Sequence, residues 1–329
     1  MRSPQSSMPA TPGPVRQGVI LAAGRGSRLQ PLSQLTPKPL APICNKPIMQ
    51  YQMEAMRNAG ITDIAVVINT SGSNGHSIKK YFGSGTQFGL ALTYIEDPHP
   101  AGIASSFALT ESWVRGPVAV FLGDIFVAID DFTPALQYMD CAAAGCIVVR
   151  HDTVEAVRRN FSVELAPDGR VHRVVEKPAN PNTGLKGVGV YVFDQTIFEA
   201  IHRTPASALR NEVEITDAVQ NLIDMGRPVW PSDVVKWDVN ITYPEDLLRC
   251  NLRVLQDMEL EYLIGEGTKL SSEAQFIRSV VGHDAVVESP AIFTECIILP
   301  GVDVGVPHGA QHRRIFAEGL VWSSNEAHR

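Results

Sequence analysis

Leu21-Ala22-Ala23-Gly24-Arg25-Gly26-Ser27-Arg28 is the stretch with the strongest structural signal in this chain. It follows a short apolar run, residues 18–21, which predicts a buried first β-strand. Glycine lets the backbone curl around an anion because no Cβ stands in the way, so the N–H groups of such a loop can face phosphate oxygens. The stretch therefore predicts a phosphate-binding loop at the end of a strand.

Two cationic side chains flank this loop: Arg28 closes it, and Lys38 lies in Thr36-Pro37-Lys38-Pro39. The spacing excludes two common phosphate loops. A dinucleotide loop has the pattern G-x-G-x-x-G, but Leu29 stands where the third glycine would be, and the Walker pattern G-x-x-x-x-G-K-[ST] is absent. The glycines and cations indicate a site for a nucleoside triphosphate. The alternative is a tight turn between a strand and a helix.

The composition of the whole chain narrows its class. A formal net charge of -7 without a basic run argues against nucleic acid as the main partner. No apolar stretch approaches the roughly 20 residues that a membrane span needs. The five cysteines form no C-x-x-C pair, so we expect reduced, mostly buried thiols in a cytoplasmic protein. Residues 1–16 are rich in Ser and Pro without the apolar middle of a signal peptide, which predicts a disordered leader.

Strand-like and helix-like segments alternate through residues 17–251. This alternation predicts an α/β domain with a doubly wound, mostly parallel, Rossmann-like sheet whose ligands bind at the carboxyl ends of the strands. A helix is expected over residues 48–59, because Gly60 follows it as a C-cap would. The further strand candidates are residues 64–68, 90–94, 118–122, 146–149 and 188–193.

The pattern changes after this domain. We expect a linker helix over residues 252–270, a short left-handed parallel β-helix fragment over residues 271–307, and a tail, 308–329, without a pattern. The β-helix is indicated by a six-residue period, in which one apolar side chain per repeat points inward. The repeating residues are Val280, Val286, Ile292, Ile298 and Val304. A pair of ordinary strands with the same spacing is the alternative.

Two aspartates lie where a metal ion is expected. Asp124 follows the apolar run 118–122 in Gly123-Asp124, and Asp238 lies in Trp237-Asp238. Carboxylates at strand ends beside a triphosphate are the usual ligands of Mg²⁺, which would neutralise charge on an α-phosphate under attack. Taken alone, each aspartate is more typical of a helix cap or a turn.

Glu176-Lys177-Pro178 follows the strand-like residues 171–175. Pro178 ends the strand and fixes the turn, which would aim Lys177 at a defined point. A solvated charge pair is the alternative.

Together these motifs resemble the sugar-1-phosphate nucleotidyltransferases, and most closely the bacterial glucose-1-phosphate thymidylyltransferases of the longer form with a β-helix tail. The resemblance implies that an oxygen of a sugar 1-phosphate attacks the α-phosphorus of a nucleoside triphosphate and that pyrophosphate leaves. The product would be an NDP-sugar for specialised or cell-surface glycan metabolism. The motifs follow one another in order over nearly all of residues 18–251: 21–28, Lys38, Gly123-Asp124, Glu176-Lys177-Pro178, Glu214-Ile215-Thr216-Asp217-Ala218 and Trp237-Asp238.

The resemblance also implies roles for the residues of the nucleotide side. Arg28 and Lys38 would stabilise the pyrophosphate as charge builds on it. Asp124 and Asp238 would hold Mg²⁺, so that catalysis works by positioning and charge neutralisation without a covalent intermediate. The nucleotide would be bound by Leu21, Ala22, Ala23, Gly24, Gly26, Asp97 and Gly102.

On the acceptor side, Lys177 would grip the phosphate of the sugar, and Glu176 would accept hydrogen bonds from its hydroxyls. Ile125, Ser162 and Val188 would complete this site. Ile125 stands where the family usually has Asn, and Ser162 stands where a glycine usually leaves space beside the sugar ring. We therefore expect an acceptor other than plain glucose 1-phosphate, such as a deoxy sugar or cyclitol phosphate.

The base-binding segment departs from the family as well. Asp97 precedes Pro98 where the thymidylyltransferases have Gln. Gln both donates and accepts, which suits thymine or uracil, whereas a carboxylate only accepts and suits the N1–H and N2–H₂ donors of guanine. We therefore expect GTP, with dTTP next; alternatively Asp97 points away and caps a turn before Pro98. Val239-Asn240 also replaces the usual Thr-Gly after the metal-binding aspartate.

Other functions remain open at this point. One is a glucose-1-phosphate thymidylyltransferase proper. Another is a catalytically silent regulatory or scaffold paralogue, which is disfavoured because the expected catalytic set is complete: Arg28, Lys38, Asp124, Lys177 and Asp238. A nicotinamide-dependent oxidoreductase is disfavoured, because this chain lacks the third glycine of the dinucleotide loop and an acidic residue roughly 20 residues further on. Relatives are commonly oligomers, so we expect a homodimer or homotetramer.

Overall fold

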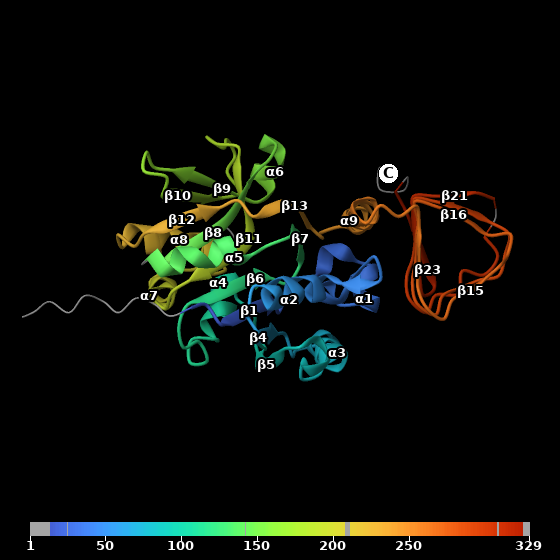
Figure 1. The fold of residues 1–329 in the computed structure, drawn as a ribbon, viewed down its shortest axis with the longest axis horizontal. Helices are drawn as coiled ribbons and strands as arrows, with labels where there is room; N and C mark the ends of the chain where they lie inside the picture. The colour runs from blue at the N-terminus through green and yellow to red at the C-terminus, as the bar shows by residue number, and fades with distance from the viewer. Residues whose placement is uncertain (1–13, 25, 142, 208–210, 308, 325–329) are drawn as a thin grey trace, which may run out of the picture.

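The chain folds into an α/β body followed by a coil of short strands (Figure 1). The computed structural model describes residues 14–24, 26–141, 143–207, 211–307 and 309–324. The predicted leader, residues 1–16, therefore lies outside the described residues except for its last three positions. Within the described residues, every helix is too short or too polar to cross a bilayer.

One half of the central sheet is parallel, as predicted. β1 (Gln17–Ala22) pairs on one side with β4 (Asp63–Ile68) and on the other with β6 (Val118–Leu122), and β5 (Ala91–Glu96) continues the sheet beyond β4. Val19 and Ile20 of β1 and residues 64–68 of β4 are completely buried, because helices cover both faces of the sheet.

The other half is antiparallel, so the sheet is mixed and less parallel than predicted. β11 (Leu185–Phe193) is antiparallel to β6, to β8 (Gly145–His151) and to β9 (Phe161–Leu165). β10 (Val171–Glu176) returns beside β9 after a short turn, which permits only an antiparallel pair. β12 (Val229–Ser232) joins the edge of β8 in parallel. All the predicted strands are present, as β1, β4, β5, β6, β8, β10 and β11.

Helices cover the two faces of the sheet with two separate apolar cores. α2 (Ile48–Asn58) buries Met49 and Met53 on one face, and it ends before Gly60, whose φ of 86° confirms the predicted C-cap. α3 (Ser73–Phe82) and α5 (Thr133–Leu136) lie on the same face. The other face is covered by α4 (Ile103–Ala108), α7 (Thr196–His202) and α8 (Ile215–Asp224). The remaining short helices are α1 (Leu32–Leu35) and α6 (Val154–Arg159).

The cysteines with described side chains lie in apolar cores: Cys146 in the core beneath α2, and the other three in a third core, which continues into the coil. As predicted, they are free and buried, and burial raises the pKa of each thiol: Cys44, Cys146, Cys250 and Cys296.

A two-stranded ribbon leads from the sheet to the C-terminal coil. β13 (Val235–Asn240) runs antiparallel to β7 (Ile125–Ile129), so that Asn240 lies opposite Ile125. α9 (Pro244–Asp257) follows directly, and its N-terminus is capped because Asp246 accepts hydrogen bonds from the N–H groups of Thr242 (3.0 Å) and Tyr243 (2.8 Å). Figure 1 shows α9 between the body and the coil.

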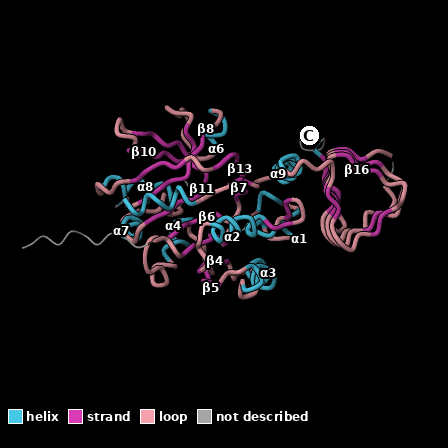
Figure 2. Tube along the Cα trace, viewed as in Figure 1, coloured by secondary structure: helices cyan, strands magenta, loops and turns pink. Residues whose placement is uncertain are grey.

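The coil has three faces, each a stack of short parallel strands (Figure 2). Leu263 pairs with Val280 and Val280 with Ile297, so one turn of the coil takes 17 residues, one fewer than three six-residue repeats. The first face contains β14 (Leu263–Ile264), β17 (Val280–Val281), β20 (Ile297–Ile298) and β22 (Arg314–Ala317), with β23 (Leu320–Ser323) antiparallel at its edge. The others contain β15 (Lys269–Leu270) with β18 (Val286–Val287), and β16 (Gln275–Ile277) with β19 (Ile292–Thr294) and β21 (Gln311–His312).

The coil is longer than the predicted fragment, 271–307. It begins at Leu263, inside the predicted linker helix 252–270, because α9 already ends at Asp257. The first turn was missed because Lys269 and Gln275 occupy its next repeat positions and are polar. The described part of the predicted tail, 309–324, continues the coil in β21, β22 and β23. The left-handed sense stays a prediction.

We expect the close approach of β11 to β9 to limit Gly187 to glycine. A Cβ at Gly187 would lie 1.8 Å from Cζ of the buried Phe161 ring, so Gly187→Ala must displace that ring. The free energy of unfolding in denaturant should fall by roughly 1–3 kcal/mol. Gly184→Ala is the matched control, because its Cβ would meet no atom closer than 3.5 Å. Equal stability of both variants would contradict the tight packing of β9 on β11.

Candidate active site

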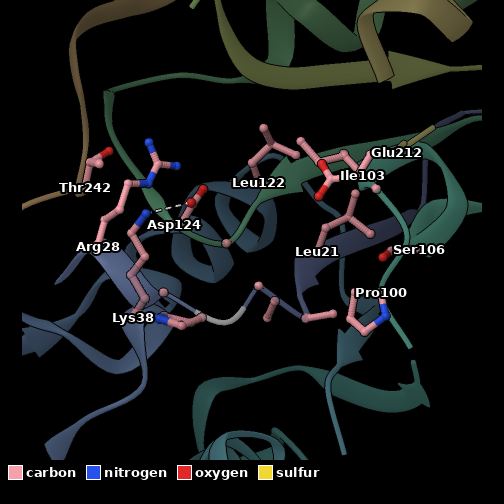
Figure 3. A pocket seen from close by; sticks show the side chains of 17 residues that line it. Leu21, Arg28, Lys38, Pro100, Ile103, Ser106, Leu122, Asp124, Glu212 and Thr242 are labelled. Atoms are coloured by element: carbon pink, nitrogen blue, oxygen red, sulfur yellow. Dashed lines mark hydrogen bonds and ion pairs between the residues drawn. The ribbon is translucent and has the colours of Figure 1, made fainter. Parts of the chain in front are cut away.

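A cavity of about 550 Å³ opens at the carboxyl ends of β1 and β6 (Figure 3). The predicted phosphate loop lines one side of the cavity, and residues from other parts of the body line the rest. The structure brings together most of the predicted nucleotide-side residues there: Leu21, Ala22, Ala23, Gly24, Gly26, Arg28, Lys38, Gly102 and Asp124. Four further lining residues adjoin the predicted ones: Pro39, Ile103, Leu122 and Gly123. Sequence analysis missed the rest of the lining: Pro100, Ser106, Glu212 and Thr242.

Two lining glycines are required by the backbone. Gly26 has a φ of 63°, in the left-handed region that a side chain disfavours. Gly102 has a φ of 123°, and a Cβ there would lie 2.5 Å from the carbonyl oxygen of Val213. Glycine therefore permits the backbone conformation at both positions and, at Gly102, the close packing against Val213.

Lys38 is the central cation of the cavity. It begins the short 3-10 helix η2 (Lys38–Leu40), and the residue is only 8% exposed. Its Nζ lies 2.8 Å from Oδ2 of Asp124 and 3.4 Å from Oδ1 of Asn240. Arg28, from the 3-10 helix η1 (Ser27–Leu29), stands beside this group in Figure 3 and is exposed. A buried ammonium thus joins three segments that lie far apart in the sequence.

Asn240 supplies the second oxygen that contacts the Lys38 ammonium, and sequence analysis missed this role. The pairing of β13 with β7 places Asn240 beside Asp124, and the N–H of Ile241 donates to the carbonyl oxygen of Asp124 (3.2 Å). Thr242 Oγ1 also donates to Oδ1 of Asn240 (3.2 Å). The available signal was the strand alternation Trp237-Asp238-Val239-Asn240, in which Asp238 and Asn240 share one face.

The described contacts of Asp238 are with Lys186 and Arg150 rather than with Asp124. The carboxylate of Asp238 accepts hydrogen bonds from Lys186 Nζ at 2.8 and 2.9 Å and from Arg150 Nε at 3.0 Å. Its side chain is 4% exposed, and the residue does not line the cavity. These donors contact both oxygens, so Asp238 belongs to a buried charge cluster, and its role as a metal ligand with Asp124 stays a prediction.

Asp152 completes this cluster. Its carboxylate lies 3.0 Å from Lys186 Nζ and also forms an ion pair with Arg150. Burial opposes ionisation of Asp152, but the hydrogen bond from Lys186 and the two neighbouring cations outweigh it and lower its pKa. Two cations and two carboxylates therefore neutralise one another inside the body.

Asp97 faces the protein. The residue is 5% exposed, its Oδ2 accepts from Ser106 Oγ at 2.6 Å, and its Oδ1 accepts from the N–H of His99 at 3.2 Å. The second contact spans Pro98, which is the turn that the alternative interpretation predicted. Ser106 lines the cavity whereas Asp97 does not.

The predicted acceptor residues also lie outside the lining of this cavity. Ile125, Ser162 and Val188 are almost completely buried. Glu176 ends β10, where its Oε2 accepts from Thr216 Oγ1 at 2.9 Å. Lys177 follows with its Nζ 3.4 Å from Oε1 of Glu176 and remains exposed. Among the described residues, no cluster of three or more His, Cys, Asp or Glu side chains could hold a metal ion.

Comparisons with known proteins agree with this geometry. The profile of the nucleotidyl transferase family matches residues 17–239. A glucose-1-phosphate thymidylyltransferase from Streptomyces antibioticus is 33% identical over 292 residues, which cover 88% of this chain and 79% of that protein. The low-salt glycan biosynthesis nucleotidyltransferase Agl11 of Haloferax volcanii is 33% identical over 248 residues, 74% of this chain and 68% of that protein. A Bacillus anthracis structure with bound sucrose, described as a glucose-1-phosphate thymidylyltransferase, superposes with a TM-score of 0.65 at 25% identity, over 71% of this chain and 93% of that chain.

We expect Asp238 and Asp124 to differ in what they contribute. Asp238→Asn leaves Lys186 and Arg150 with Asp152 as the remaining counter-charge of this cluster and should lower the free energy of unfolding by about 3–5 kcal/mol. Asp124 has a side chain that is 42% exposed, so water screens the loss of its charge and Asp124→Asn, which keeps an oxygen for Lys38, should cost less than Asp238→Asn. Denaturant unfolding of the two variants measures the difference. A small loss for Asp238→Asn would contradict the buried charge cluster.

Proposed function

This chain belongs to the nucleotidyl transferase family, and we propose that it transfers a nucleoside monophosphate from a nucleoside triphosphate to a sugar or cyclitol 1-phosphate, releasing pyrophosphate. One observation carries this proposal: the glycine loop, Arg28, Lys38 and Asp124 line one cavity at the carboxyl ends of two parallel strands. Such an edge is where α/β proteins bind their ligands.

The cationic side chains account for the phosphate chemistry. An oxygen of the acceptor phosphate forms a bond to the α-phosphorus while the bond from that phosphorus to the β-phosphate oxygen breaks. Negative charge grows on the departing pyrophosphate, and Arg28 and Lys38 stabilise it at the side of the cavity where both stand. The loop N–H groups hold the triphosphate in line, so no covalent intermediate is needed.

Asp124 and Asn240 are the residues that we assign to Mg²⁺, in place of the predicted pair with Asp238. Their oxygens converge on one point, which the Lys38 ammonium occupies in this structure. Two oxygen ligands suit Mg²⁺, because that ion keeps several of its waters. When bound, it would neutralise charge on the phosphate oxygens. The donors around Asp238 support this choice over the predicted pair.

Our proposal for the nucleobase moves from GTP to dTTP or UTP. The preference for GTP required a carboxylate that faces the base, but the contacts of Asp97 with Ser106 and His99 support the loop instead. The names of two relatives, a thymidylyltransferase and a uridylyltransferase, point to pyrimidine triphosphates.

For the acceptor, we retain Lys177 as the group that grips the sugar phosphate and Glu176 as the group that accepts from hydroxyls. Thr216 holds Glu176 in place, and Lys177 remains exposed. A deoxy sugar or cyclitol phosphate as the acceptor stays a prediction from the sequence, because Ile125 and Ser162 are buried and do not line the cavity. The homo-oligomer and the cytoplasmic location stay predictions.

Release of pyrophosphate tests this function directly. The purified chain with Mg²⁺ should release pyrophosphate from dTTP or UTP only when a sugar or cyclitol 1-phosphate is present.

Lys38→Ala should lower kcat/KM by about 100-fold or more, because it removes charge that stabilises the leaving group. Asn240→Ala should raise the Mg²⁺ concentration needed for half-maximal rate. Lys79→Ala is the control, since Lys79 pairs with Glu96 on the surface. Silence with every acceptor would favour the scaffold paralogue.

The role of Asp97 has its own test. Asp97→Asn keeps a side-chain acceptor but removes the charge that Ser106 and His99 contact. If Asp97 supports the loop, the variant should lower kcat/KM for dTTP, UTP and GTP by the same factor, within about threefold. If the wild type prefers GTP and the variant loses kcat/KM with GTP alone, Asp97 contacts guanine as the sequence predicted.

A further inference from the structure

The coil and the active site share one hydrophobic core. Buried side chains from the coil, from α9, from β13 and from residues 29–48 form a single contiguous cluster. The segment 29–48 contains Lys38, and β13 ends at Asn240. Both segments that carry the cavity's central contact are therefore packed against the same core as the coil.

A hydrogen bond joins the coil to the Lys38 segment. Asn45 Nδ2 donates to the carbonyl oxygen of Val281 in β17 at 2.8 Å. Asn45 lies in the tight turn between β2 (Pro42–Ile43) and β3 (Lys46–Pro47), where its φ is 65°. β2 alone separates this turn from Ala41 and η2, so the coil holds the chain a short distance beyond Lys38.

α9 holds the same turn from the other side. Asn251 is completely buried and accepts from the N–H of Cys44 at 2.7 Å. Its Nδ2 donates to the carbonyl oxygens of Pro42 and Leu247, each at 3.0 Å. All the polar atoms of this amide are satisfied, which makes the junction between α9 and the turn rigid.

An ion pair joins the coil to the Asn240 segment. Arg313, which precedes β22, reaches Oε1 of Glu245 in the first turn of α9 at 2.6 Å and Oε2 of Glu295 in the coil at 2.7 Å. Asp246 follows Glu245 and caps the N–H groups of Thr242 and Tyr243. The contact thus reaches Thr242, whose hydroxyl donates to Asn240.

We propose that the coil is a positioning part of the nucleotide site, in which Asn45 and Glu245 are the residues that transmit its position. This rests on the proposed function for the identity of the site, but not for the contacts themselves. Asn45 sets the segment of Lys38, and Glu245 sets the segment of Asn240. Together they fix where the ammonium and the two oxygens meet.

Loss of the coil contacts should affect the binding of the nucleotide and the metal ion. A displacement of about 1 Å in a positioning group can cost 100-fold in rate. Loss of either coil contact lets one segment shift while the body keeps its cores, so the KM for the Mg²⁺–triphosphate should rise more than kcat falls. A purely structural role would instead lower stability and leave KM unchanged.

The experiment uses the full chain with Asn45→Gly, Glu245→Gln and the double variant. Glycine preserves the positive φ of position 45 and removes only the amide, and Gln at position 245 removes only the charge that meets Arg313. Arg314→Gln is the matched control, because Arg314 Nη1 donates to Gln311 within the coil. Circular dichroism melting verifies that each variant is folded.

Two readouts decide the outcome. The KM and the calorimetric Kd for Mg²⁺–triphosphate should rise by roughly 3- to 30-fold in the double variant and stay within about twofold in the control. Amide hydrogen exchange of residues 38–47 and 240–246 should accelerate, while β4 and β5 keep their protection. Unchanged exchange in the folded double variant would overturn the proposal whatever ligand the protein takes. A wild type that binds no triphosphate would overturn the proposed function alone.

Discussion

The ammonium group of Lys38 holds the site together. It is buried, so it needs oxygen partners, and it finds them in Asp124 at the end of β6 and Asn240 at the end of β13. This contact joins three distant parts of the chain at the edge of the cavity. It also places a positive charge at the edge of the cavity, and such a charge attracts anions.

A second group of charged side chains does not line the cavity, unlike Lys38 and Asp124. Asp238, Lys186, Arg150 and Asp152 satisfy one another inside the body. A carboxylate with all its oxygens taken by fixed cations has little left for a ligand, whereas the side chain of Asp124 is 42% exposed and faces the cavity. The two aspartates therefore differ in what surrounds them and not in their chemistry.

The coil extends the core of the body. Its interior, α9 and the segment after the phosphate loop belong to one apolar cluster, and Asn45, Asn251 and Arg313 add polar contacts across the junction. Positions within such a continuous core are coupled, because packed interiors transmit small displacements. This continuity is the physical basis for linking the coil to the geometry around Lys38.

Local signals in the sequence were sufficient for the phosphate loop, the parallel strands and the six-residue repeat, since each depends on neighbouring residues and their period. The same holds for Lys38 and Asp124, which lie in short motifs beside those strands. The partner of Asp124 was decided only by the tertiary structure. Asp238 and Asn240 share one face of β13, and the register with β7, together with Lys186 and Arg150 from β11 and β8, selects Asn240. The orientation of Asp97 likewise depended on Ser106 in α4. Contacts between segments far apart in the chain leave no periodic trace in the sequence, so only the folded chain settles them.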